Sequence, residues 1–184
     1  TDEYMRTNVE DVYAAGDVAE MTHTVTGEPD HVPLALTANR AGRAIGQTIS
    51  SGPTPVGEIA GTAVVKAFDL AAARTGITDE EAARKAGFDP VSVTIDAPSR
   101  AHYYPGGDTL ELTMVADRET EQVLGASIVG KDGVAKRIDT VATALHEGMT
   151  VEAVEYLDLA YAPPFSPTWD PVLTTAKVLN GKLE

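Results

Sequence analysis

A glycine followed by a lone carboxylate is the first pattern in the chain that could do chemistry. A short apolar run, residues 12–15, ends at Gly16, and Asp17 follows directly. Glycine has no Cβ, so another molecule can approach the backbone of Gly16 closely. The carboxylate of Asp17 can accept charge-assisted hydrogen bonds from hydroxyl groups. Loops at the carboxyl ends of strands hold ligands in open α/β sheets, so this pair is a candidate ligand loop. The alternative is a simple turn or helix N-cap.

Two further clusters hold aromatic residues beside prolines. Tyr103 and Tyr104 precede a Pro-Gly turn, where adjacent tyrosines usually pack at a strand end. Residues 161–171 contain several prolines that keep the chain extended, so Tyr161 and other aromatic residues are presented from a stiff loop. The alternative for this loop is an interface between subunits, because aromatic residues are enriched there.

The composition excludes several kinds of site. The formal net charge of −14 argues against nucleic acid and anionic membrane surfaces as partners. No apolar stretch approaches the roughly 20 residues that cross a bilayer, and the start of the chain is no signal peptide, so we expect a cytoplasmic protein. The absence of cysteine excludes a thiolate nucleophile, and no metal site is predicted. The acidic composition favours adaptation to high salt; a merely solubilising surface is the alternative.

The first segment predicts a strand, a ligand loop and a helix. The helix has apolar residues at steps of three and four, which form one face: Leu34, Ala38, Ala41, Ile45 and Ile49. Pro33 suits its first turn, where a missing N–H costs nothing. Two prolines and a glycine between residues 50 and 55 cannot continue this helix. We therefore expect a domain boundary there, which gives domains 1–55 and 56–184.

The second segment predicts a sheet with helices. Residues 62–70 indicate a buried strand, and 78–87 a short helix that begins with a capping box. Three more strands are expected at 91–95, 110–114 and 122–129, followed by helices at 134–146, 150–156 and from about residue 170 onward. The grouping of strands and helices indicates an α+β domain with an antiparallel sheet and flanking helices.

The sequence around Gly16 resembles a known motif. Tyr-Ala-Ala-Gly-Asp at residues 13–17, Pro-Leu-Ala at 33–35 and Arg-x-Gly-Arg at 40–43 resemble the second FAD-contacting motif of the flavin-dependent pyridine nucleotide-disulfide oxidoreductases. The resemblance implies that domain 1–55 is the tail of an α/β FAD-binding domain. It implies that Gly16 and Asp17 contact FAD, and that the Asp17 carboxylate is hydrogen-bonded to the ribityl chain. The segment Leu34, Ala35 and Leu36 would pass beside the isoalloxazine ring.

The two aromatic clusters narrow the resemblance. Tyr-Ala-Pro-Pro-Phe-Ser-Pro-x-Trp-Asp-Pro at 161–171, with His-Tyr-Tyr-Pro at 102–105, resembles coenzyme A disulfide reductases and their NADH oxidase relatives. The resemblance implies a homodimer in which Tyr103 and Tyr161 reach the active site of the other subunit, beside a redox cysteine that lies outside this chain. Tyr104 is less favoured than Tyr103, and His102 fits a structural role better than a catalytic one. Arg100 is the only base nearby in the sequence.

The resemblance implies an enzyme that reduces a disulfide and so contributes to redox homeostasis. Electrons would pass from NAD(P)H to FAD and then to a cysteine–coenzyme A mixed disulfide, in which a phenol could donate a hydrogen bond or a proton. Oxygen or peroxide is the alternative acceptor within this class. A dimerisation module with no catalysis of its own is the alternative from another class.

Overall fold

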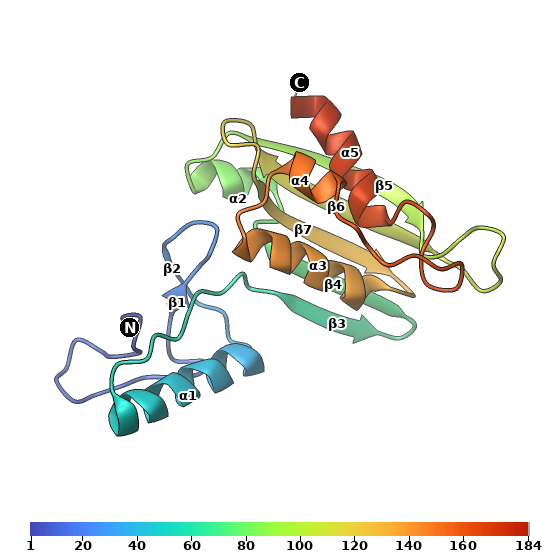
Figure 1. Cartoon of the computed structure of the whole chain (residues 1–184). Coiled ribbons are helices and arrows are strands. Elements are labelled where there is room, and N and C mark those ends of the chain that lie inside the picture. Colours follow the sequence, from blue (N-terminus) through green and yellow to red (C-terminus); the bar gives the residue numbers. More distant parts are fainter. Residues whose placement is uncertain (184) are drawn as a thin grey trace. The chain divides into compact units, whose positions relative to one another are not determined.

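The structure is a computed structural model that describes residues 1–183, and its contacts divide the chain into two compact units. The first unit is Thr1–Gly61, and the second begins at Thr62. In the part of the chain that is described, no helix is long and apolar enough to cross a membrane. The cartoon in Figure 1 labels the elements of both units.

The first unit contains one long helix and a small antiparallel pair of strands. The pair is β1 (Met21–Thr22) with β2 (Pro29–Asp30), and the helix is α1 (Ala35–Ser51). Apolar residues from separate parts of the unit form its core, where burial removes their surfaces from water: Met5, Ala19, Met21, Val32, Ala41 and Ile59.

Three details of this unit differ from the sequence predictions. The apolar run 12–15 is not a strand, because its only ladder partner among residues 1–183 is one bridge between Tyr13 and Arg6. Pro33 precedes the N-cap residue Leu34 and so lies outside the first turn of α1. Ile49 is 69% exposed, because the helix turns Ala41, Ala44 and Thr48 inward instead.

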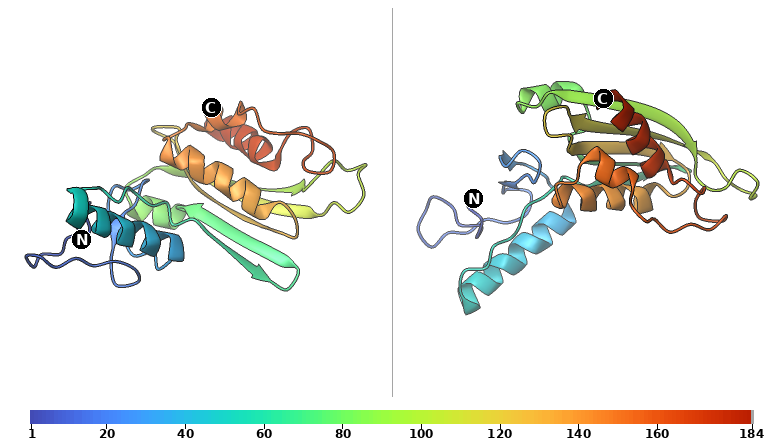
Figure 2. Two further views of the ribbon diagram at one scale, coloured as in Figure 1. Left: turned by 60° about the horizontal axis from the view of Figure 1, so that its bottom comes forward. Right: turned by 45° about the horizontal axis from the view of Figure 1, so that its top comes forward.

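The second unit is a five-stranded antiparallel sheet with the strand order β3-β4-β7-β6-β5. The strands are β3 (Ala63–Ala67), β4 (Leu70–Gly76), β5 (Pro90–Pro98), β6 (Thr109–Asp117) and β7 (Val123–Gly130). The helices are α2 (Glu80–Lys85), α3 (Val134–His146), α4 (Val151–Glu155) and α5 (Pro171–Leu183). Figure 2 shows α3, α4 and α5 on the same face of the sheet. The predicted α+β class with an antiparallel sheet and flanking helices is thus confirmed.

The core of this unit lies between the sheet and the helices on that face. Strand β6 runs between β5 and β7, and Leu110, Leu112 and Met114 on it are fully buried. Ile138 on α3 and Leu179 on α5 are buried as well. The alternation predicted for β6 therefore marks the face that the helices cover, as the two-residue period of a strand requires.

The segment 62–70 is not the single buried strand that its composition predicted. It spans β3 and the start of β4, which form a hairpin, and the chain reverses where Phe68 adopts φ 56°. Strand β3 is the edge of the sheet, so Val64 and Val65 remain 56% and 61% exposed. Strand β4 was missed because its alanine-rich sequence carries no β-branched or aromatic signal.

The helix at 78–87 is present but begins one residue later than predicted. Asp79, not Thr78, is the N-cap of α2, and its carboxylate accepts a hydrogen bond of 2.8 Å from the N–H of Ala82. Helix α4 is capped by Thr150 in the same way, through a bond of 3.2 Å from the N–H of Ala153. Helix α3 has the predicted bounds.

Candidate active site

The two tyrosines singled out by the sequence lie on loops that touch each other. Tyr103 is on the loop between β5 and β6, and Tyr161 is on the loop between α4 and α5. The N–H of Ala101 on the first loop donates to the carbonyl of Pro163 on the second, at 3.3 Å. The hydroxyl oxygens of Tyr103 and Tyr161 are 3.2 Å apart, which is hydrogen-bond distance. The structure therefore brings together two residues that are 58 positions apart in the sequence.

The hydrogen bond makes the two phenols different. Either hydroxyl can donate in this bond. When Tyr161 is ionised, the Tyr103 hydroxyl donates to its oxygen, which lowers the pKa of Tyr161, and Thr168 lowers it further. The same bond raises the pKa of Tyr103. Both side chains are accessible, with exposed fractions of 65% for Tyr103 and 46% for Tyr161. Tyr161 is thus the more acidic of the two phenols.

A buried ion pair lies beneath the two loops. Arg137 on α3 is 1% exposed, and Asp170, directly before α5, is 2% exposed. Nε of Arg137 lies 3.1 Å from both carboxylate oxygens of Asp170, and Nη2 lies 3.1 Å from Oδ2. Lys136 lies 3.8 Å from the same oxygen. Buried charges are costly unless they are paired and hydrogen-bonded, and here both conditions are met.

The remaining donors of Arg137 and acceptors of Asp170 are also used. Nη2 of Arg137 donates to the carbonyl of Ser99 at 3.0 Å, and Nη1 donates to the carbonyl of Gly133 at 3.1 Å. The carboxylate of Asp170 accepts from the hydroxyl of Ser166 and from the N–H of Val172, each at 3.0 Å. The second bond caps the start of α5, where Pro171 occupies the first helical position.

Sequence reasoning missed the Arg137–Asp170 pair. An arginine in an amphipathic helix is normally taken as a surface residue, yet Arg137 lies in the apolar stripe of α3 beside Val134, Ile138 and Val141. The helical spacing that places Arg137 in this stripe was the one signal that could have indicated its burial. At the start of the final helix, Pro171 was predicted to lie in the first turn, but Asp170 was given no role.

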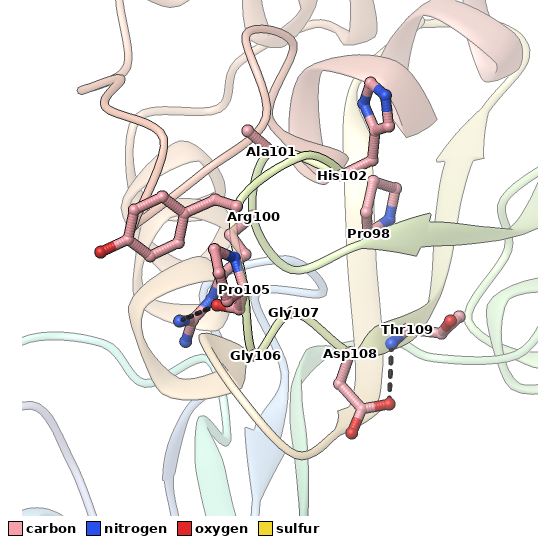
Figure 3. Close-up of a pocket in the computed structure, with 10 residues that line it drawn as sticks. Pro98, Arg100, Ala101, His102, Pro105, Gly106, Gly107, Asp108 and Thr109 are labelled. Atoms are coloured by element: carbon pink, nitrogen blue, oxygen red, sulfur yellow. Dashed lines mark hydrogen bonds between the residues drawn. The ribbon is translucent and has the colours of Figure 1, made fainter.

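A cavity of about 420 Å³ is formed by the loop from Pro98 to Thr109. Figure 3 shows the Arg100 guanidinium beside Pro105, with His102 on the other side of the loop. Arg100 forms an ion pair with Asp132, so its charge is already compensated. Tyr104 lines the cavity rather than meeting Tyr161.

The other side chains near this cavity have structural contacts. The ring of His102 packs edge-on against Tyr103, with ring centres 5.6 Å apart. Lys131 lies 3.1 Å from Asp108 and holds the pKa of that carboxyl below its usual range. Among residues 1–183, no group of three or more histidines or carboxylates is placed to hold a metal ion.

The residues predicted to contact FAD gather at the start of α1. Gly16 adopts φ 82°, and a Cβ built on it would lie 3.8 Å from Cβ of Ala38, so this loop runs beside the first turns of the helix. Nε2 of His31 lies 2.7 Å from the carbonyl oxygen of Asp17, whose side chain is exposed.

The start of α1 is itself open. Leu34 is the N-cap residue and is half-buried, Ala35 begins the helix, and Leu36 is 72% exposed. The first N–H groups of a helix have no acceptor within the helix, and they favour negative charge nearby. The start of α1 thus carries backbone donors beside an apolar, exposed surface.

Comparison with known proteins places this geometry in context. The family described as pyridine nucleotide-disulphide oxidoreductase, dimerisation domain, matches residues 62–171. An NAD(P)H coenzyme A polysulfide/persulfide reductase of Pyrococcus horikoshii is 46% identical over 180 residues, which are 98% of this chain and 40% of that protein. A coenzyme A disulfide reductase of Staphylococcus aureus is 36% identical over 163 residues, 88% of this chain and 36% of that protein.

A solved structure agrees with these matches. The NAD-dependent persulfide reductase from A. fulgidus superposes with a TM-score of 0.93 at 44% identity, over 98% of this chain and 33% of that one. The present chain thus spans well under half the length of these relatives.

Proposed function

Because the chain belongs to the pyridine nucleotide-disulphide oxidoreductase family, we propose that it forms the C-terminal part of a homodimeric flavoprotein. This enzyme would pass electrons from NAD(P)H through FAD to a coenzyme A disulfide. In this proposal residues 1–55 end the FAD-binding domain, and residues 56–184 form the dimerisation domain. The observation that carries the proposal is the 3.2 Å contact between the hydroxyls of Tyr103 and Tyr161, within a chain similar to coenzyme A-dependent reductases.

The start of α1 fits a flavin. FAD, when bound, accepts a hydride from NAD(P)H and passes two electrons to a disulfide. The exposed carboxylate of Asp17 would accept hydrogen bonds from the ribityl hydroxyls, and Gly16 would let that chain approach the backbone. The N–H groups at Ala35 and Leu36 would stabilise negative charge on the flavin edge, while Leu34 anchors the helix start to the core.

The tyrosine pair fits the departure of a thiolate. In the balanced reaction, one NAD(P)H and one proton reduce a coenzyme A disulfide to two thiols. The sulfur–sulfur bond breaks, and the leaving sulfur takes up an electron pair and needs a proton. Tyr161 would donate its hydrogen to that sulfur, and Tyr103 would support it by donating to the Tyr161 oxygen. We propose that the pair serves the active site of the other subunit in the homodimer.

The decisive experiment compares tyrosine variants of the full-length enzyme. Tyr161→Phe should lower the turnover of coenzyme A disulfide at least about tenfold, because the proton donor is lost. Reduction of the flavin by NAD(P)H should keep its rate, since this step precedes disulfide chemistry. Tyr156→Phe is the matched control, because Tyr156 is an exposed tyrosine on the C-terminal side of α4. Equal turnover in the two variants would overturn the proposed role of Tyr161.

The electron acceptor is tested in the same preparation. Oxygen or peroxide consumption without coenzyme A disulfide, at a rate above disulfide turnover, would assign the enzyme to the oxidase branch instead. The chain by itself tests the non-catalytic alternative through its mass in solution and its absorbance. A colourless dimer would identify the isolated chain as a dimerisation module, whereas bound flavin would contradict that assignment.

The flavin contact has its own test. Asp17→Asn in the full-length enzyme should reduce the FAD retained after gel filtration, because the charge-assisted hydrogen bonds are weakened. Glu28→Gln is the control, since it removes one exposed carboxylate from the same unit. Equal FAD content in both variants would remove Asp17 from the flavin site.

A further inference from the structure

We infer that the buried Arg137–Asp170 pair is a positioning element that holds Tyr103 and Tyr161 in register with each other. The inference rests on the proposed function only in giving the tyrosines a catalytic role. Its structural basis is independent of that role, because it follows from which segments the pair connects.

Arg137 reaches both tyrosine loops with one side chain. Nη2 binds the carbonyl of Ser99, the first residue of the loop that carries Tyr103. Nε binds Asp170, the last residue of the loop that carries Tyr161. The planar guanidinium has donors at fixed angles, so the distance between these two loop ends is set by one rigid group.

Asp170 extends the connection further into the second loop. Ser166, which is 1% exposed, donates to Oδ2 of Asp170 at 3.0 Å. Ser166 in turn follows the turn at 162–165, where its N–H binds the carbonyl of Ala162, the residue after Tyr161. A series of hydrogen bonds therefore connects Arg137 to Ala162, the residue after Tyr161.

The tyrosines themselves lack this degree of support. Their rings are about half or more exposed. Beyond the hydroxyl contact, the Tyr103 ring has one edge-on contact with His102, and the Tyr161 hydroxyl is hydrogen-bonded with Thr168. Apart from their hydroxyl contact, the loops share the bond from Ala101 to Pro163, which at 3.3 Å is long. Two phenols separated by 3.2 Å lose their hydrogen bond if the loops move apart by about 0.5 Å, because hydrogen bonds weaken steeply with distance. The pair beneath the loops therefore controls whether the phenols meet.

The test removes both charges together. In the full-length enzyme, Arg137→Met combined with Asp170→Asn leaves no buried unpaired charge, and the asparagine can still cap α5 through Val172. Lys85→Met combined with Glu81→Leu is the matched control, since it deletes an exposed ion pair on α2. Flavin content and circular dichroism confirm that each variant is folded.

Two readouts separate positioning from stability. Site-resolved NMR titration of the chain should show that the lowered pKa of Tyr161 rises toward the ordinary range in the Arg137/Asp170 variant, because the contribution of Tyr103 is lost while that of Thr168 stays. In the full-length enzyme, kcat for coenzyme A disulfide should fall at least about fivefold, toward the value of Tyr161→Phe. Flavin reduction by NAD(P)H should not change. A folded variant with both the Tyr161 titration and kcat unchanged would overturn the inference.

A second variant covers failure of the first to fold. Arg137→Lys keeps the charge, but an ammonium lacks the planar fork that reaches Ser99 and Asp170 at once. The pKa of Tyr161 should again rise toward the ordinary range, and an unchanged titration would contradict the positioning role. If Tyr161→Phe leaves turnover intact while these variants shift the titration, the positioning stands and the proposed catalytic function fails.

Discussion

The carbonyl oxygen of Gly133 accepts a hydrogen bond of 3.1 Å from Nη1 of Arg137, one helical turn further along the chain. Gly133 has φ 76°, a left-handed conformation that favours glycine. A side chain at this position would also run into the Arg137 guanidinium. The glycine therefore makes room for the arginine that connects the tyrosine loops.

Gly133→Ala should destabilise the second unit more than its backbone strain alone predicts. Gly87→Ala is the control, because Gly87 has φ 94° but open space around its Cβ position. The control should cost about 1–2 kcal/mol of unfolding free energy, the penalty for a left-handed residue. Gly133→Ala should cost at least about 1 kcal/mol more, because Arg137 must move as well. Urea denaturation measures both values, and equal losses would show that Arg137 adapts freely.

The tyrosine pair predicts an order of ionisation. Tyr161 should lose its proton before Tyr103 as the pH rises, because the Tyr103 hydroxyl donates to the Tyr161 oxygen and stabilises the phenolate. Tyr103→Phe removes that donor, so the pKa of Tyr161 should rise toward the ordinary value of about 10. NMR titration of ring-labelled tyrosine checks this, with Tyr156→Phe to confirm the assignment. If the pKa of Tyr161 does not respond to Tyr103→Phe, the two hydroxyls are not hydrogen-bonded in solution.

Asp117 predicts an acid-dependent part of the stability. Burial would raise the pKa of this carboxyl, but hydrogen bonds from Thr120 and from the N–H of Asp89 outweigh it and lower the pKa. A lowered folded-state pKa means that the stabilisation is present above the unfolded value of about 3.9 and is lost as the pH falls through the folded value.

Asp117→Asn should therefore lower the unfolding free energy at neutral pH, by about 1–3 kcal/mol, and make it less dependent on pH in acid. Urea denaturation at several pH values from 7 downward measures both effects. Asp96→Asn, an exposed position on β5, should leave the stability near that of the unchanged chain. A constant gap between Asp117→Asn and the unchanged chain across the acid range would contradict the assignment.

Phe68 combines full exposure with an unfavourable backbone. Its side chain is 99% exposed, and its φ of 56° is rare for an aromatic residue. Phe68→Asn should raise the unfolding free energy by up to about 1 kcal/mol, because asparagine tolerates this conformation. Leu70→Asn, at the start of β4, should lower it instead. A loss of stability in Phe68→Asn would show that the ring is covered in solution, for example by a second copy of the chain.

Much of the second unit could be predicted because its signals are local. The alternation of Leu110, Leu112 and Met114 identified β6, and the helical spacing of Ile138, Val141 and Leu145 gave α3 its bounds. The β3–β4 hairpin could not be read in this way. Its alanines carry little propensity, and whether Val64 and Val65 are covered depends on the sheet order, which is not a local property.

The sequence by itself determined the fold class, the family and the choice of Tyr103 and Tyr161 as candidate residues. Motifs and hydrophobic periodicity are local patterns, so they can be recognised without the tertiary structure. Only the tertiary structure decided that their hydroxyls meet, and that Arg137 and Asp170, 33 positions apart, are buried against each other beneath them. The physical reason is burial. A charged residue in a helix has the same sequence signal at the surface and in the core, and packing of distant segments alone decides which environment it has.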